Sequence, residues 1–362
     1  MKTEATEKKD GTVTIKDISS RLNVSSTSVH RALSGKVGVS ETLRQKIIET
    51  ANEMGYTANY AAAALKRKTI RIAAVLPQDD GLYFDSIWQG LRACEQEIRG
   101  LNIEVVPILA QDEFEQKERL KEIADSGSAY SGVVTYSFTP KAASLLQMQR
   151  LVSQKVATVL LDENIVEPEG LYCIPSNAAA VGRVAGELVS LITPETGTVL
   201  ISGGRKDAQN HTEKRESFVE YLHQHKPGIR VVVAEGFSRS RTQCETIHRE
   251  MVNAMKENRK ELVAAYALTA IDDVQMVRAA QEAELLDRIH LVGTDLNRFT
   301  ADCLRQGSLK AVIDQGAYMK GYTGLKLLVD KILKNEEPTR RFDCPVEIVL
   351  ASNLRFYEHI RP

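Results

Sequence analysis

Two features are scarce in this 362-residue sequence: long apolar runs and paired cysteines. No apolar run approaches the ~18 residues of a membrane-spanning helix, and the first residues, MKTEATEKKDG, are too polar for a secretory signal. The five cysteines show no C-x-x-C spacing, which argues against a disulfide framework or a zinc ribbon. We therefore expect a cytoplasmic protein with reduced thiols and no membrane segment.

Catalytic and nucleotide-binding motifs are also missing. The sequence contains no G-x-G-x-x-G, no G-x-x-x-x-G-K-[ST] and no G-x-S-x-G pattern. His223 and His225 are two residues apart on an expected helix, so they face different sides and do not form a metal-binding pair. We therefore predict no catalytic residues, no bound metal and no cofactor, and we expect that the protein is not an enzyme.

The charge is balanced overall but unevenly distributed. The net charge is −1, yet residues 1–72 hold 13 Lys and Arg against 7 Asp and Glu, whereas the remainder holds 34 against 41. A basic N-terminal part on an acidic body indicates a polyanionic partner for the N-terminal part alone. The length and the 43% hydrophobic content are otherwise typical of a globular protein with two or three domains.

Three short amphipathic helices are expected before residue 58, after a disordered tail at 1–12. Ser25 and Ser40 stand where helix N-caps belong. Only the three residues 23–25 separate the first two helices, which forces a tight turn. The apolar stripes of the three helices are Ile18 and Leu22, then Val29, Ala32 and Leu33, then Leu43, Ile47, Ala51 and Met54.

After Thr69 apolar strands alternate with helices, a pattern typical of parallel α/β sheets covered on both faces. There are too many units for one sheet, so two lobes are expected, dividing near residues 173–176. Ligands of such sheets lie beyond the carboxyl ends of the strands. Strands are expected at 70–76, 103–109, 132–136, 156–161, 198–202, 230–235, 262–268, 289–293 and 309–313. Helices are expected at 86–98, 115–125, 177–191, 214–225, 240–257, 271–283 and 317–334.

The second expected helix turns polar donors away from its apolar stripe. Ser26, Thr27, His30 and Arg31 can reach base edges and phosphates in a DNA major groove. The surrounding segment carries T-I-K-D-I, V-S-x-x-[ST]-V-x-R-A-L, V-S-x-x-[TL]-R, E-x-G-Y and N-x-x-A-x-x-L at fixed spacing. In these motifs the sequence resembles the lactose-repressor (LacI/GalR) family, and the α/β remainder is similar to that family's body in order and length.

The resemblance implies a helix-turn-helix head that binds a pseudo-palindromic operator in double-stranded DNA. By position, Ser26, Thr27 and Arg31 would read bases, whereas Ser25, Ser28 and Asn59 would meet phosphate. Two departures from the family pattern bear on base preference and helix orientation: His30 stands where a serine is usual, and Leu22-Asn23 replaces the usual Ala-Gly. The residues assigned to DNA are Thr14, Ser25, Ser26, Thr27, Ser28, His30, Arg31, Asn59, Ala62 and Leu65.

Residues 59–69 are expected to form a short hinge helix and linker. A helix of only about two turns is marginal in water, so it would fold on DNA or beside a partner subunit. In the family this helix pairs with its twin in the minor groove, where a leucine wedges a base step. Leu65 matches that leucine, and Ala62 is small enough for close approach. Ala63 stands where many relatives carry Arg, and the basic residues 66–68 could compensate.

The α/β part is expected to hold its ligand-binding residues just after strands. Carboxylates, amides and a lysine bind hydroxyls, and aromatic rings cover the apolar face of a sugar. Taken singly, Tyr83 or Trp88 could instead pack in the core, and Asp162, Asp272 or Asp295 could cap a helix or turn. The candidates are Asp79, Tyr83, Phe84, Trp88, Tyr136, Asp162, His211, Lys214, Asp272, Asp295 and Gln315.

The family's effector domain resembles periplasmic sugar-binding proteins, in which Asp162, Asp295 and Gln315 match ligand-contacting positions. Lys214 stands in place of a common arginine, so an anionic ligand group is less firmly implied. The resemblance implies an all-α head at 13–58 and a two-lobed, periplasmic-binding-protein-like domain with two parallel-sheet subdomains at 70–362. Lobe 1 would comprise about 70–173 plus 316–340, and lobe 2 about 175–313 plus 341–362.

The expected function is that of a transcriptional repressor, a homodimer, whose operator affinity is controlled by a small molecule bound between the lobes. A sugar or sugar derivative is the expected effector, and a nucleobase or another non-sugar metabolite remains an alternative. A solute-binding protein or an enzyme is less favoured, because the DNA-binding head is present and the catalytic motifs are not. The sequence does not choose between induction and co-repression.

Overall fold

The computed structural model describes residues 13–33, 37–56, 67–78, 82–136, 138, 143–163, 170–205, 208–236, 244–334 and 337–357. The predicted tail at 1–12, the predicted hinge residues Asn59, Ala62 and Leu65, and the predicted ligand residue Asp79 lie outside these ranges. The chain divides into two compact units. One contains Met1–Thr69 with two short segments, and the other contains nearly all of the remainder.

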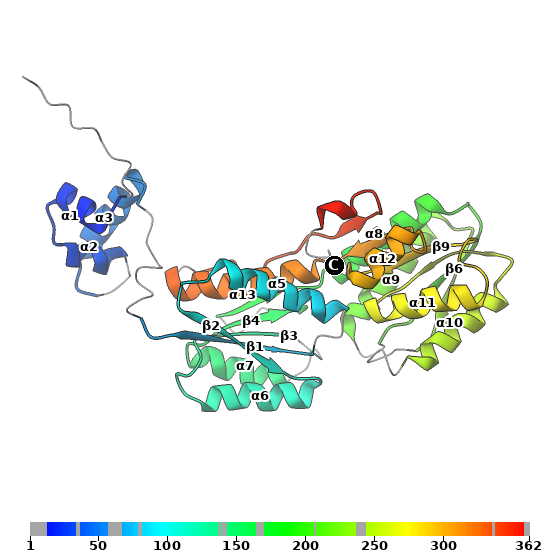
Figure 1. Cartoon of the computed structure of the whole chain (residues 1–362), viewed down its shortest axis with the longest axis horizontal. Helices are drawn as coiled ribbons and strands as arrows, with labels where there is room; N and C mark the ends of the chain where they lie inside the picture. The colour runs from blue at the N-terminus through cyan, green and yellow to red at the C-terminus, as the bar shows by residue number, and fades with distance from the viewer. Residues whose placement is uncertain are drawn as a thin grey trace, which may run out of the picture. The chain divides into compact units, whose positions relative to one another are not determined.

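The N-terminal unit holds the three predicted helices, α1 (Ile15–Leu22), α2 (Ser26–Leu33) and α3 (Glu41–Glu53). They meet around Ile18, Val29 and Ile47, which are fully buried. This small core follows from the predicted stripes, because residues three or four apart share one face of a helix. The labels and colours of Figure 1 locate these helices at the blue end of the chain.

Local hydrogen bonds fix where the helices of this head begin and end. Both predicted caps are present: the Ser28 amide donates to Ser25 Oγ over 3.0 Å, and the Leu43 amide donates to Ser40 Oγ over 3.4 Å. Asn23 ends α1 in the left-handed region, at φ 52°, which reverses the chain within the three residues that were available. The turn of the helix-turn-helix motif is therefore encoded locally.

Lobe 1 is built on a parallel sheet with the strand order β2-β1-β3-β4-β5. Helices α6 and α7 pack on one face, where Leu120, Ile123 and Leu151 join the strand residues of the core. Helices α5 and α13 cover the other face (Figure 1). The strands are β1 (Ile70–Leu76), β2 (Ile103–Leu109), β3 (Gly132–Tyr136), β4 (Ala157–Leu161) and β5 (Leu171–Ile174). The helices are α5 (Tyr83–Glu97), α6 (Glu113–Asp125), α7 (Ala143–Ser153) and α13 (Ala317–Lys334).

Lobe 2 is built on a second sheet, with the order β11-β10-β9-β8-β6-β7, in which only β11 is antiparallel. Helices α8 and α9 cover one face and α10, α11 and α12 the other. The strands are β6 (Gly197–Ser202), β7 (Ile229–Ala234), β8 (Leu262–Tyr266), β9 (His290–Thr294), β10 (Ala311–Asp314) and β11 (Glu347–Val349). The helices are α8 (Ala178–Ile192), α9 (Gln209–His225), α10 (Glu245–Glu257), α11 (Ala270–Glu282), α12 (Arg298–Gln306) and the 3-10 turn η1 (Leu354–Phe356).

The chain passes between the two sheets three times. It leaves lobe 1 after β5, returns after β10 to form α13, and leaves again through residues 340–342, which hydrogen-bond to Cys173 over 2.7 and 3.0 Å. Glycines let α13 lie tightly on α5, because a Cβ on Gly90 would lie 2.0 Å from the Tyr318 carbonyl oxygen. The carboxyl ends of the parallel strands of both lobes thus border one space.

The predicted fold class is confirmed, with small differences in the elements. Each of the nine predicted strands is present, and its ends lie within two residues of the predicted ones. Strands β5 and β11 and helices α7 and α12 were not predicted. β5 and β11 have only four and three residues, too few for a pattern to emerge. Within the described residues, no helix combines the length and apolar character that crossing a membrane requires.

Candidate functional site

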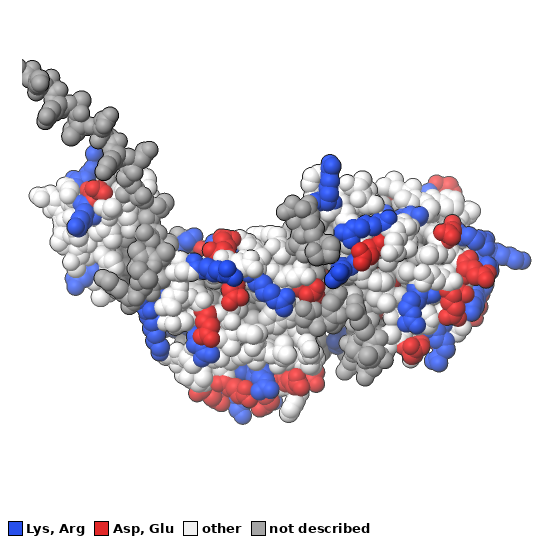
Figure 2. Space-filling view, in the orientation of Figure 1, with Lys and Arg blue, Asp and Glu red and all other residues white. Residues whose placement is uncertain are grey.

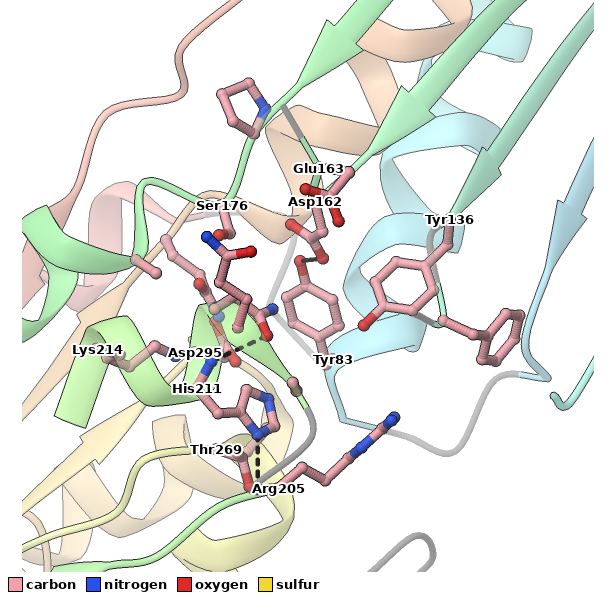
Figure 3. A pocket seen from close by; sticks show the side chains of 18 of the residues that line it. Tyr83, Tyr136, Asp162, Glu163, Ser176, Arg205, His211, Lys214, Thr269 and Asp295 are labelled. Atoms are coloured by element: carbon pink, nitrogen blue, oxygen red, sulfur yellow. Dashed lines mark hydrogen bonds between the residues drawn. The ribbon is translucent and has the colours of Figure 1, made fainter. Parts of the chain in front are cut away.

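A cavity of about 1150 Å³ lies within the second unit and is lined from both lobes. It is where the carboxyl ends of the parallel strands predict a ligand site. In Figure 3, Tyr83 and Tyr136 enter the cavity from one side, and Lys214, His211 and Asp295 from the other. Eight of the predicted ligand residues line it: Tyr83, Phe84, Tyr136, Asp162, His211, Lys214, Asp295 and Gln315.

Asp295 is the lobe 2 carboxylate that lines the cavity just after β9. Its backbone is left-handed, at φ 66°, and its amide donates to the Ile313 carbonyl over 2.9 Å, which turns the side chain off the end of the strand. The residue is 3% exposed, and Oδ1 has no hydrogen-bond partner among the described residues. Burial raises the pKa of this carboxyl, and the ammonium groups of Lys214 and Lys320 oppose the rise. Oδ1 is therefore an acceptor that a ligand hydroxyl can satisfy.

Asp162 occupies the matching place in lobe 1, after β4. It has φ 64°, and its amide donates to the Ile174 carbonyl over 2.8 Å. Both of its carboxylate oxygens already have donors: Lys320 Nζ lies 2.6 Å from Oδ1, and the Tyr83 hydroxyl donates to Oδ2. Lys320 also donates to the Tyr83 oxygen over 3.1 Å. Asp162 lines the cavity, but these contacts hold it in place and leave it less free than Asp295 to accept from a ligand.

Lys320 was not among the predicted site residues, although it is fully buried in α13. It lies beside the apolar stripe of that helix, between Ala317 and Gly321. A lone lysine among residues that must be buried requires an anionic partner, because an unpaired buried charge is costly. This need for an anionic partner was the signal in the sequence. It could not identify Asp162 as the partner, because Asp162 is 158 positions away.

Lys214 and His211 come from the first turns of α9. Lys214 is 3% exposed and donates to the Leu268 carbonyl over 3.0 Å, and burial lowers the pKa of its ammonium. The Arg205 amide donates to His211 Nδ1 over 3.0 Å, so the neutral ring carries its proton on Nε2. Gly204, at φ 65°, makes this turn possible, because a Cβ there would lie 2.6 Å from Leu268 Cδ2.

Aromatic rings form the lobe 1 side of the cavity. Tyr83, Phe84, Tyr136 and Phe138 lie in a row, with centroids 5.4, 5.1 and 5.4 Å apart and each pair edge to face. Burial raises the pKa of Tyr136, and the nearby Arg205 guanidinium opposes this. Phe138 and Arg205 also line the cavity and were not predicted, although both follow strands as the predicted residues do.

Two predicted ligand residues, Trp88 and Asp272, do not line the cavity. The Trp88 side chain, from α5, donates its Nε1–H to the Pro77 carbonyl over 2.8 Å. Asp272 is fully buried beneath the lining, where it accepts from the Ser202 hydroxyl over 2.7 Å, and burial raises its pKa to about 6. Asp272 lies in the first turn of α11 and Trp88 in the second turn of α5, and both side chains are buried.

In the N-terminal unit, the predicted base-reading residues share the outer face of α2. Ser26, Thr27, His30 and Arg31 are exposed, opposite the buried Val29 and Ala32. Figure 2 shows Lys and Arg side chains on the face of this head that is in view. Other predicted DNA-binding residues hydrogen-bond within the N-terminal unit. The Ser25 and Ser28 hydroxyls lie 2.9 Å apart. The amide and hydroxyl of Thr14 donate to Asp17, which lowers the pKa of the Asp17 carboxyl.

Comparison with known families agrees with both halves of this description. Residues 14–59 match the model described as bacterial regulatory proteins, lacI family. Residues 72–337 match the model of a periplasmic binding protein domain. The chain belongs to the lacI family. It is therefore a DNA-binding regulator of transcription with a periplasmic-binding-protein-like body, and the predicted resemblance is confirmed.

Relatives of this lacI-family chain cover most of its length. The ribose operon repressor of Lactococcus lactis subsp. lactis (strain IL1403) is 22% identical over 347 residues, which cover 94% of this chain and 98% of that protein. A putative LacI transcriptional regulator from Bacteroides fragilis has a similar structure, with a TM-score of 0.69 and 16% identity over 80% of this chain and all of that one. A periplasmic solute-binding protein from Actinobacillus succinogenes 130z, solved with bound D-allose, also gives a TM-score of 0.69, at 15% identity over 80% of this chain and 100% of that chain. The two structures show the shared fold alone.

Proposed function

We propose that this lacI-family regulator is a repressor whose operator affinity is controlled by a sugar or sugar derivative bound in the cavity at Asp295. The observation that carries the proposal is the buried Oδ1 of Asp295, which has no hydrogen-bond partner in the described part of the chain. A buried carboxylate oxygen without a donor is costly, so a ligand hydroxyl that reaches it gains the interaction at little further desolvation cost.

The surrounding groups suit a polyhydroxylated ring. The Gln315 amide hydrogen-bonds to the Asp295 side chain, His211 lines the same cavity, and Tyr83 supplies an aromatic surface on the opposite lobe. Hydroxyl groups both donate and accept, so a sugar satisfies this mixed set better than an aliphatic ligand. The names of the relatives point the same way, one being a ribose operon repressor and one a solute-binding protein with bound D-allose.

The link from the cavity to DNA would pass through the lobes. A ligand that contacts Tyr83 in lobe 1 and Asp295 in lobe 2 binds most tightly at one separation of the lobes, so it shifts the population toward that separation. We propose that two copies of the chain bind the two halves of a pseudo-palindromic operator. Residues 59–69 would then fold or unfold as the spacing of the two copies changes. A free-energy difference of a few kcal/mol between the two states is enough to change operator occupancy strongly.

A thermal-shift panel tests the sugar half of the proposal. Full-length protein is heated with pentoses, hexoses, polyols and nucleobases, and the panel is repeated with Asp295→Asn and with Asp302→Asn, an exposed aspartate of α12. A ligand at 100 times its Kd stabilises the folded state by about 2.7 kcal/mol. We expect a selective sugar to stabilise the wild type and Asp302→Asn but not Asp295→Asn. Stabilisation by nucleobases alone, or equal stabilisation of all three proteins, would reject the sugar assignment.

A further inference from the structure

The loop between α5 and β2 holds the chain that leads into β1. The Asn102 side-chain amide donates to the Arg67 carbonyl over 2.7 Å, and the Thr69 hydroxyl donates to Asn102 Oδ1 over 3.1 Å. The backbone of Asn102 is left-handed, at φ 52°, a conformation that asparagine and glycine adopt more readily than other residues. Regular pairing of β1 with β2 begins at Ile70 and Ile103. The Asn102 side chain therefore extends the attachment of the incoming chain by three residues, back to Arg67.

Arg67 adds a second contact to the same loop. Its guanidinium donates from Nη2 to the Leu101 carbonyl, and its Nε is shielded from solvent. The sequence suggested that the basic residues 66–68 compensate for a phosphate contact missing at Ala63. In the structure Lys68 is exposed, as a phosphate contact requires, whereas the Arg67 side chain is bound to the loop. Two adjacent basic residues therefore have different surroundings.

We infer that Asn102, Arg67 and Thr69 form a clasp that positions the DNA-binding head for its operator. The clasp fixes residues 67–69 ahead of β1, so it sets how many residues separate the head from the first fixed point of the α/β part. Without the clasp that connection is three residues longer. The inference depends on the DNA-binding function of the chain and not on the identity of the effector.

A longer connection weakens operator binding without removing a contact to DNA. Fixing the backbone of one residue costs a free energy equivalent to about a tenfold loss of affinity, so residues that must be ordered again on the operator reduce its affinity by at least that factor. Non-specific binding relies on phosphate contacts and needs no fixed position of the head. The loss should therefore be specific to the operator.

Fluorescence anisotropy on the full-length protein tests the clasp, with a palindromic duplex selected in vitro by the wild type and a scrambled duplex. Asn102→Gly removes the side chain and keeps the left-handed turn, which glycine tolerates. We expect operator affinity to fall about tenfold, whereas the affinity for the scrambled duplex and the urea midpoint of unfolding stay unchanged. Asn353→Gly is the matched control, since Asn353 also bridges two backbone groups, the Ile348 carbonyl and the Leu350 amide, but lies in lobe 2.

Arg67→Met distinguishes positioning from phosphate contact. We expect operator affinity to fall about tenfold, as in Asn102→Gly, while the slope of log affinity against log salt concentration stays that of the wild type. A lost phosphate contact would instead reduce that slope by about 0.9. The double variant should bind the operator no more weakly than the weaker of the two single variants, because both substitutions release the same clasp.

Limited trypsin digestion without DNA reports the clasp directly. Cleavage after Arg67 or Lys68 requires this segment to leave the loop, because a protease needs a locally open chain. Asn102→Gly should raise the rate of both cuts, identified by mass spectrometry, and Asn353→Gly should leave the rate at the wild-type value.

Three results would overturn the inference. The first is an operator affinity of Asn102→Gly equal to that of Asn353→Gly. The second is an equal loss of affinity for the operator and the scrambled duplex, which would show that the head is damaged rather than displaced. The third is a reduced salt slope in Arg67→Met together with unchanged cleavage in Asn102→Gly, which would make Arg67 a phosphate contact and not part of a clasp.

Discussion

Asp162 and Asp295 occupy the same place in the two lobes and have different surroundings. Each follows a strand, has φ near +65° and donates its amide to the carbonyl of the next strand over 2.8 to 2.9 Å. Lobe 1 supplies Lys320 and Tyr83 as partners for its aspartate, whereas Oδ1 of Asp295 has no partner among the residues that the structure describes. A repeated backbone position thus serves stability in one lobe and leaves an acceptor for a ligand in the other.

The largest effect should come from removing the partner of Asp162. Lys320→Met leaves a buried carboxylate without its cation, and we expect the free energy of unfolding to fall by about 3–5 kcal/mol in urea denaturation. Lys320→Met combined with Asp162→Asn should recover much of this loss, because no unpaired charge remains.

Lys326→Met is the control for this comparison. Lys326 lies on α13, as Lys320 does, and its Nζ lies 3.2 Å from a carboxylate oxygen of Glu97 in α5. Its side chain is 36% exposed, so we expect the free energy of unfolding to change by only about 0–1 kcal/mol. If Lys320→Met proves as stable as Lys326→Met, the Asp162 ion pair does not stabilise lobe 1 and the contrast between the lobes fails.

Asp295→Asn should lose ligand affinity rather than stability. It removes a charge whose Oδ1 has no partner within the described ranges, so we expect little loss of stability. Ligand affinity should fall by about 1.5–3 kcal/mol, the contribution of a hydrogen bond to a charged group. Calorimetry with the sugar that stabilises the wild type measures the affinity, and urea denaturation measures the stability. A variant that loses stability but keeps its affinity would assign Asp295 a structural role like that of Asp162.

The DNA-binding surface should respond independently of both aspartates. Arg31→Ala should weaken operator binding by about 1–3 kcal/mol and relax base discrimination, without changing the affinity for the sugar. Fluorescence anisotropy with operator and scrambled duplexes checks this, with Lys260→Ala in an exposed loop of lobe 2 as the control. Unchanged operator binding in Arg31→Ala would show that α2 does not read bases.

The most specific test concerns pH, through Asp314 in lobe 2. Burial raises the pKa of its carboxyl to about 7, from 3.8, so the folded state binds the proton more tightly than the unfolded state. Its effect on stability is therefore most favourable at low pH and is lost as pH rises from about 4 to about 7. The stability of Asp314→Asn relative to the wild type should increase between pH 5 and pH 8 in urea denaturation. A constant difference across that range would contradict the raised pKa.

The sequence predicted positions better than it predicted orientations. Asp162 and Asp295 were both found because they follow apolar strands, but nothing local distinguished them, since the partner Lys320 is 158 residues from Asp162. Trp88 and Asp272 also come after strands, yet both are buried in helices, where they hydrogen-bond to the Pro77 carbonyl and the Ser202 hydroxyl and do not line the cavity. Strand β5 escaped prediction because it has four residues and gains its stability from pairing with β4.

The central claim is that a sugar bound at Asp295 controls operator binding. The most direct measurement is the affinity of wild type and Asp295→Asn for a palindromic duplex selected in vitro by the wild-type protein, with and without the stabilising sugar. We predict equal affinities without sugar, and a change of at least about tenfold, or 1.4 kcal/mol, on adding sugar to the wild type alone. If the sugar leaves the wild-type affinity unchanged, or shifts the variant equally, the account is contradicted.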